Sequence, residues 1–372
     1  MMKKIIFLII PIFILASCSG GDDSNNTSGD DYNRTELLMN WADNLIIPRY
    51  NDYQSKVNAL HTNTTTFTSN PDQTNLDAVR TSWLEAYKAY QYVGAFNIGK
   101  AEEINLNSAT NVYPTNVVGI ESNITNGGYN FALLSQYDKQ GFPAIDYLIN
   151  GLANNDTEII DFYVSNTNAT GYKQYLTDLS SQLKTNIDLI ITDWNTSYRN
   201  AFINSNGNSV SSSVNKTVNN FVKHYEKDIR AGKIGIPAGV YSNGTVYPEK
   251  VEGLYKGDIS KILLNESIKA AQDFFNGKHF NSNAIGISLK SYLDYLNTVR
   301  NGQNLSDIIN NQFSTINDTN AALNDSFANQ VNTNNTAMLS SFDALQQNVV
   351  YFKLDMMQAL NITVDYVDAD GD

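Results

Sequence analysis

Apolar residues recur at steps of three and four along most of the chain, and the strict alternation typical of strands is scarce. This spacing places apolar side chains on one face of a helix. The pattern therefore predicts an all-α protein whose amphipathic helices pack on one another. The most regular stripe consists of Leu176, Leu179, Leu183, Ile187, Ile190 and Trp194.

A polar stretch rich in Asn, Gly and Ser occupies residues 195–213, in the middle of the helical pattern. Such clusters mark loops between regular elements. Helical stripes lie on both sides of it, so we predict two helical-bundle domains, over residues 32–200 and 201–372. Pro48 is expected to kink or divide the first helix. The stripes span residues 37–60, 76–90, 176–194, 210–229, 262–275, 292–299, 305–327 and 339–356.

Three irregular segments, 97–130, 140–151 and 232–257, interrupt the helices and are rich in Gly, Pro and Tyr. Long irregular segments in a compact helical protein are frequently functional. We therefore expect the functional site in these segments.

The N-terminal residues have the order of a secretory signal. Lys3 and Lys4 precede an apolar run, Ile5–Leu15, that is too short to cross the hydrocarbon core of about 30 Å. The next residues complete a Leu-Ala-Ser-Cys sequence that resembles the bacterial lipobox, in which cleavage leaves the cysteine as a lipid-modified N-terminus. We predict a lipoprotein signal peptide at 1–17 and lipid attachment at Cys18. The simpler alternative is a cysteine within an ordinary signal peptide.

Residues 18–31 are almost entirely Gly, Ser, Asn, Thr and Asp after the cysteine, which predicts a flexible tether. A lipid anchor followed by a tether implies a location in the cell envelope. We expect an outer-membrane lipoprotein, either periplasmic or exposed at the cell surface.

The chain is acidic, with 25 Lys and Arg against 38 Asp and Glu among 372 residues and a formal net charge of −13. This charge argues against a nucleic-acid partner, because such partners are bound by neutralising phosphates. The single cysteine excludes an intramolecular disulfide. The expected partners are the membrane, through the anchor, and a small ligand, a metal or an outer-membrane protein.

Most catalytic templates are missing from the sequence. The three histidines, His61, His224 and His279, are far apart, and the chain has no HExxH, GxSxG, P-loop or dinucleotide-binding motif. Asp368 and Asp370 alternate like the first ligands of a calcium loop, although the sequence favours a solvated acidic tail because no bidentate Glu follows them. The sequence by itself identifies no catalytic residue.

The segment Gly141–Ile149 joins a Gly-Phe-Pro turn to an apolar run that carries one acid. Pro143 suits the first turn of a helix. Asp146 would then lie in that turn, near the positive end of the helix dipole. An acid that only stabilises a helix requires no further function.

This segment resembles the imelysin family, which is named for an insulin-cleaving metallopeptidase and includes iron-regulated envelope proteins. The resemblance implies two helical bundles with a functional groove at their junction. It extends over nearly the whole mature chain through motifs at 40–43, 47–48, 80–86, 112–115, 120–121, 141–148, 230–237, 248–252, 275–277 and 368–372.

The hallmark of that family is GxHxxE, and the aligned residues here are Gly141, Pro143 and Asp146. Proline has no side-chain donor atom and binds no metal. The resemblance thus implies a variant that lacks the metallopeptidase chemistry assigned to the motif.

Our leading hypothesis is a non-enzymatic binding or accessory protein in iron or haem uptake, and the link to iron comes from the resemblance alone. Carboxylates and phenols suit iron or another divalent or trivalent cation, and tyrosine rings suit haem. Asp146, Asp368 and Asp370 are the candidate metal ligands. The candidate binding residues are Gly141, Pro143, Asp146 and Tyr147, followed by Tyr113, Glu121, Arg230 and Glu252.

Two alternatives remain open. One is a metal-dependent peptidase in which Asp146, Glu121 or Glu252 acts with His224. The other is a structural scaffold for outer-membrane partners. If the binding hypothesis holds, Asp146, Tyr113, Arg230 and Glu252 are expected to converge on one pocket.

Overall fold

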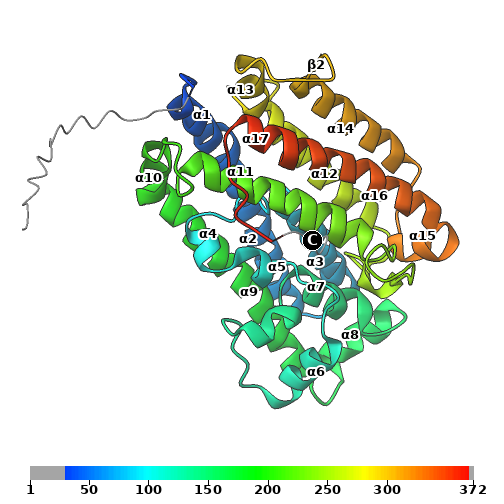
Figure 1. Cartoon of the computed structure of the whole chain (residues 1–372). Coiled ribbons are helices and arrows are strands. Elements are labelled where there is room, and N and C mark those ends of the chain that lie inside the picture. The colour runs from blue at the N-terminus through cyan, green and yellow to red at the C-terminus, as the bar shows by residue number, and fades with distance from the viewer. Residues whose placement is uncertain (1–29, 368–372) are drawn as a thin grey trace, which may run out of the picture. The chain divides into compact units, whose positions relative to one another are not determined.

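Helices make up nearly all the regular structure that the computed structural model describes, which covers residues 30–367. The predicted signal peptide, Cys18, Asp368 and Asp370 lie outside these residues and stay predictions. The all-α class is confirmed (Figure 1). In the described part of the chain, no helix is both long enough and apolar enough to span a membrane.

The first half of the chain contains α1 to α10. Wide-turned π-helical segments (η1, η3, η4) continue several of these helices without a break, and η2 is a short 3-10 helix. The bounds are α1 Arg34–Asn40, η1 Trp41–Ile46, α2 Ile47–Ser69, α3 Gln73–Tyr90, α4 Lys100–Glu103, α5 Leu106–Thr110, α6 Val117–Asn126, η2 Leu134–Lys139, α7 Gly141–Asp146, η3 Tyr147–Gly151, α8 Asp156–Val164, α9 Ala169–Asp193, η4 Trp194–Tyr198 and α10 Arg199–Asn204.

The second half contains α11 to α17 and one two-stranded antiparallel hairpin, in which Val299 pairs with Asn304. The bounds are α11 Ser213–Lys223, η5 His224–Gly235, η6 Pro248–Lys250, α12 Ser260–Asn276, α13 Leu289–Tyr295, β1 Val299–Arg300, β2 Gln303–Asn304, α14 Leu305–Ala321, α15 Phe327–Thr333, α16 Asn335–Val350, η7 Tyr351–Met356 and α17 Met357–Ala359.

The predicted stripes correspond to the buried faces of these helices, with local differences. The 176–194 stripe is the buried face of α9 and the start of η4. Pro48 lies in the first turn of α2, directly after the π-helical turn, so it divides two helix types without stopping the helix. Val210 was expected on a helix but lies before Ser212, whose side chain accepts from the backbone N–H of Asn215 and starts α11.

The core continues from one half of the chain into the other. The ring of Phe274 on α12 packs against Trp41 and Phe96 at centroid distances of 5.0 and 5.3 Å, and against Phe221 at 5.1 Å. Residues 32–367 belong to one compact unit. The boundary between two bundles near residue 200 therefore stays a prediction.

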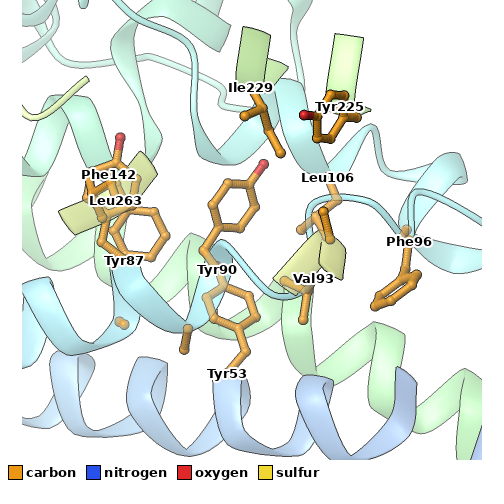
Figure 2. Packing of buried hydrophobic residues seen from close by; sticks show 14 of the residues in the cluster. Tyr53, Tyr87, Tyr90, Val93, Phe96, Leu106, Phe142, Tyr225, Ile229 and Leu263 are labelled. Carbon is orange, nitrogen blue, oxygen red and sulfur yellow. The ribbon is translucent and has the colours of Figure 1, made fainter. Parts of the chain in front are cut away.

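Helices α2 and α3 form a wall on which the irregular segments rest. Tyr53 on α2 faces Tyr90 on α3 at 6.0 Å, and Phe142 on α7 stacks on Tyr87 of α3 at 4.6 Å with nearly parallel rings (Figure 2). This packing holds the C-terminal end of α3 between α2 and α7. The polar residues at that end face the site described next.

Candidate functional site

The Gly-Phe-Pro turn is shaped by a close backbone contact. Gly141 has a φ of +76°, and a Cβ atom there would overlap the carbonyl oxygen of Thr110. Glycine is required for both reasons. The carbonyl of Phe142 accepts from Nε1 of Trp83 at 3.1 Å, and Pro143 is buried in the first turn of α7. The glycine and proline of the motif therefore position α7 against α3 and α5.

Asp146 is an anchor for another segment of the chain. It is the sixth residue of α7, so it lies beyond the first turn in which we expected it. Its two carboxylate oxygens accept from the backbone N–H groups of Tyr255 and Lys256 and from the side chain of Asn150, each at 3.0 Å. Burial raises the pKa of Asp146 to about 7, against the lowering effect of these hydrogen bonds. The carboxyl thus holds the 253–257 loop instead of capping its own helix.

Tyr147 and Glu121 bind each other in a separate group. The hydroxyl of Tyr147 donates to one oxygen of Glu121 at 2.6 Å, and Tyr172 donates to the other. Burial and the Glu121 charge raise the pKa of Tyr147 well beyond its usual range. Both oxygens of Glu121 therefore accept a phenol hydrogen.

Arg230 lies in a third group. It is buried within η5, forms an ion pair with Glu226 at 3.6 Å and lies 5.2 Å from the ring centre of Phe342. Glu226 also accepts from Tyr366 at 2.8 Å and from Lys353. This network joins η5 to α16 and to the segment after α17.

A cavity of about 460 Å³ lies between the end of α3, the 107–114 segment and η5. We call it the His224 cavity. Its size falls within the range of small-molecule sites. The side chains that define it are Tyr90, Gln91, Asn107, Asn111, Tyr113, His224, Lys227, Asp228, Lys233 and Lys250.

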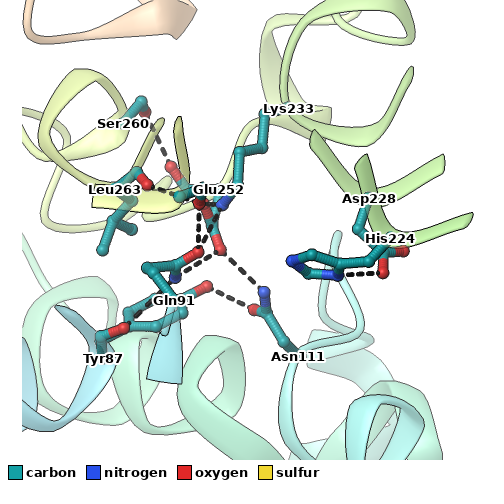
Figure 3. Close-up of polar contacts among 10 residues, drawn as sticks. Tyr87, Gln91, Asn111, His224, Asp228, Lys233, Glu252, Ser260 and Leu263 are labelled. Carbon is teal, nitrogen blue, oxygen red and sulfur yellow. Dashed lines mark hydrogen bonds and ion pairs between the residues drawn. The ribbon is translucent and has the colours of Figure 1, made fainter. Parts of the chain in front are cut away.

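A buried ion pair lies at the side of this cavity (Figure 3). Lys233 and Glu252 are only 3% and 2% exposed. The ammonium group of Lys233 donates to Glu252 and, at 2.9 Å, to Oε1 of Gln91. Glu252 also accepts from Nδ2 of Asn111 at 2.7 Å and from Nε2 of Gln91 at 3.3 Å. A buried ion pair is tolerated when further hydrogen bonds compensate for the lost water, and Gln91 and Asn111 supply such bonds here.

His224 lies beside this group with one nitrogen unused. Its Nδ1 is 2.7 Å from Oδ2 of Asp228, one turn further along η5. Because a carboxylate only accepts, Nδ1 carries the proton, and Nε2 has a free lone pair when the ring is neutral. Nε2 is buried and has no hydrogen-bond partner among residues 30–367. Figure 3 shows this nitrogen directed toward the Asn111 and Glu252 side chains.

Gly94 makes room for the imidazole. A Cβ atom at this position would lie 2.7 Å from Cε1 of His224. Tyr113, which lines the same cavity, has a pKa raised well above its usual value by burial and by the Glu252 and Asp228 charges. The site therefore combines a neutral phenol, an imidazole nitrogen and ammonium groups.

Of the four residues expected to converge on one pocket, only Tyr113 lines the His224 cavity, and Glu252 lies beside it as the partner of Lys233. Asp146 connects indirectly, because it fixes the loop that follows Glu252. Arg230 belongs to the network with Glu226, and Glu121 and Tyr147 to the phenol group. In the described part of the chain, no three His, Cys, Asp or Glu side chains are grouped so that they could hold a metal ion.

Gln91, Asn111, Asp228 and Lys233 belong to the site but were not predicted from the sequence. Asn111 and Lys233 lie in the irregular segments that we singled out, and Asp228 follows His224 at a helical step of four. The sequence therefore contained signals from which these three residues could have been predicted. Gln91 directly follows a regular helix, and nothing in its local sequence indicates its role.

Comparisons with known proteins agree with this architecture. The model of the imelysin family matches residues 46–351. The crystal structure of an imelysin-like protein from Psychrobacter arcticum 273-4 superposes with a TM-score of 0.69 at 18% identity, covering 90% of this chain and 97% of that one. A protein from Parabacteroides distasonis ATCC 8503, described as a "putative iron-regulated protein A precursor", gives 0.70 at 16% identity, with coverages of 89% and 97%. No curated protein matches the chain.

Proposed function

The chain belongs to the imelysin family, and on this premise we propose that it is an extracytoplasmic binding protein in iron uptake whose ligand occupies the His224 cavity. The description of the Parabacteroides protein as an iron-regulated precursor supports the link to iron and to export. The single observation that carries the proposal is the buried, unpartnered Nε2 of His224 at a cavity of ligand size.

The cavity lining indicates the class of ligand. Lys227 and Lys250 supply ammonium groups, since that of Lys233 is already paired with Glu252, and Tyr90 and Tyr113 supply phenol rings. Ammonium groups bind carboxylates, imidazole binds transition metals, and aromatic rings pack on planar organic groups. Two kinds of ligand suit this combination of groups, namely an anionic iron chelate, such as ferric citrate, and haem with its carboxylates.

A binding role without catalysis fits the hallmark positions. Pro143 offers no ligand atom, and both oxygens of Asp146 accept hydrogen bonds within the protein. These residues hold the 253–257 loop beside the buried ion pair. In this proposal they shape the cavity and leave ligand contact to His224 and Tyr113.

Equilibrium titration with ferric citrate and with haemin tests this function. We expect one of the two to bind saturably and His224→Gln to weaken binding by about tenfold or more, equivalent to about 1.4 kcal/mol, because the variant loses the imidazole ligand. His61→Gln is the matched control, since His61 lies apart from the cavity and contacts Ser180. Absence of saturable binding by either probe, or equal affinity of the two variants, refutes the proposal.

The N-terminal sequence supports attachment to the membrane, and we propose lipidation of Cys18. Two or more acyl chains hold a protein stably at a bilayer. Labelling of cells with a fatty-acid analogue should mark the wild type but leave Cys18→Ala unlabelled. An unlabelled wild-type protein would contradict the anchor.

One observation favours hydrolysis as a second candidate function. The Nδ1 of His224 bonded to Asp228 is the arrangement of a general base held by a carboxylate. Cleavage of a peptide library that chelators abolish, and that His224→Gln and Asp228→Asn both reduce, would support a metal-dependent peptidase. Cleavage unchanged in both variants would exclude these residues as its catalytic pair.

A further inference from the structure

A second cavity, of about 510 Å³, lies on the other side of the C-terminal end of α3. Tyr90 and Gln91 face the His224 cavity, whereas Lys88, Ala89 and Tyr92 face this one. We call it the Asp52 cavity. Its remaining side chains come from α2, α3, α12 and the segment after α12, and they are Asp52, Lys56, Glu85, Glu266, Lys269, Asp273, Lys278, His279, Phe280, Asn281, Ser282 and Asn283.

The Asp52 cavity is electrically balanced in a chain of net charge −13. Four lysines and four carboxylates line it, so their formal charges cancel. Each of α2, α3 and α12 contributes at least one group of either sign. A neutral site with separate positive and negative groups matches a ligand that also carries both charges.

Some of these charges are already used within the protein. Lys88 bonds to Glu85 at 2.8 Å, Lys269 pairs with Asp273, and the hydroxyl of Tyr92 donates to Glu266 at 2.6 Å. These pairs form part of the wall. They leave the remaining charged groups for a ligand.

Asp52, Lys56 and Lys278 have no ion pair among the residues that the structure describes. The Asp52 carboxylate also accepts no hydrogen bond there. Burial raises its pKa, the Lys56 charge opposes this increase, and the Glu85 charge adds a smaller increase. A positively charged group placed beside Asp52 and Glu85 would offset the cost of burying the Asp52 charge and the repulsion between the two carboxylates. A carboxylate placed at Lys278 would give this ammonium group the partner it lacks.

The cavity also offers an aromatic surface. The rings of Tyr92 and Phe280 meet edge to face at 5.7 Å. Nε2 of His279 is buried there without a hydrogen-bond partner among residues 30–367. An organic body can pack on these rings while its charged groups reach the helices.

We propose that the Asp52 cavity is a second ligand site, which takes a small zwitterion of the amino-acid class. The ligand ammonium group binds at Asp52, and the ligand carboxylate binds at Lys278. The two charge-assisted contacts supply the specificity, and the body of the ligand packs on Tyr92 and Phe280.

The test begins with the twenty common amino acids as probes in a thermal-shift screen of the full mature protein. The best stabiliser is then titrated by calorimetry, together with its amide, which lacks the carboxylate, and its N-acetyl form, which lacks the ammonium group. We expect a dissociation constant of about 1 mM or tighter for the free amino acid and at least about tenfold weaker binding of each derivative.

Matched variants assign each charge to its residue. In Asp52→Asn, the free amino acid should bind about as weakly as the N-acetyl form binds to the wild type. In Lys278→Gln, it should bind about as weakly as the amide does. Asp318→Asn and Lys216→Gln change exposed residues outside the cavity and should bind like the wild type.

The proposal is overturned if no amino acid binds, or if both derivatives bind as well as the free form. It is also overturned if the two cavity variants bind like their controls. Binding should persist in His224→Gln, because that residue lies in the other cavity. The result is therefore independent of the iron-related function.

Discussion

Replacement of Lys233 by Met removes one charge from the buried ion pair with Glu252. The carboxylate keeps its hydrogen bonds from Asn111 and Gln91 but loses its ion-pair partner while remaining 2% exposed. Leaving one charge of a buried pair uncompensated costs about 3–5 kcal/mol. We therefore expect the free energy of unfolding to fall by about 3–5 kcal/mol, which is a large part of the total for a typical domain.

The double variant Lys233→Met with Glu252→Met separates the charge effect from the loss of packing. It removes both charges together, while Gln91 keeps its hydrogen bond from Ser267 at 2.7 Å. We expect its loss of unfolding free energy to be at least about 2 kcal/mol smaller than the summed losses of the two single variants, because residues in direct contact couple by that order.

Urea unfolding followed by tryptophan fluorescence measures these differences, since Trp41, Trp83 and Trp194 are all buried. The control is Lys184→Met, which breaks a half-exposed pair with Asp188 and should cost less than about 1 kcal/mol. The reasoning is refuted if Lys233→Met is no more destabilising than this control, or if the double variant equals the sum of the single variants.

Two further predictions concern the Gly-Phe-Pro segment. Gly141→Ala should destabilise the protein by several kcal/mol more than Gly128→Ala in thermal or urea unfolding. Both glycines have positive φ, but only Gly141 lies against Thr110, and a Cβ atom at Gly128 would meet no atom within 4 Å. Equal effects of the two changes would show that the contact with Thr110 is unimportant. The free energy of unfolding should also fall as the pH rises from about 4 to about 7. Burial raises the pKa of Asp146 to about 7 in the native state, from about 4 in the unfolded state. Between these pH values the native state keeps a proton that the unfolded state has lost, so a rising pH favours unfolding. Asp146→Asn should flatten the fall over this range, and an identical pH profile in the variant would contradict the assignment.

The fold could be predicted from the sequence because the buried residues of a helix recur at a regular local spacing. The stripe in α9 required only the spacing of apolar residues, and each residue of that stripe is buried. The start of α11 was misjudged by a few residues, because Val210 fits the spacing but lies in the turn that Ser212 ends, where it is 63% exposed. Periodicity locates a helix face more reliably than a helix end.

The site could be predicted only in part from the sequence, because its residues contact partners that are distant along the chain. Tyr113 and Glu252 could be selected from their irregular segments, but the partners of Glu252 are separated from it by 19 residues at Lys233 and 141 at Asn111. Asp146 shows the same limit. Its own segment suggests a helix terminus, whereas its partners lie 109 and 110 residues further along.

The central claim is that the His224 cavity holds the ligand. The most direct measurement is iron anomalous diffraction from crystals of the protein saturated with whichever of ferric citrate and haemin it binds. The account predicts one iron peak in the cavity lined by His224 and Tyr113, and its loss in His224→Gln. An iron peak elsewhere, or a peak in this cavity that persists in the variant at equal occupancy, would contradict it.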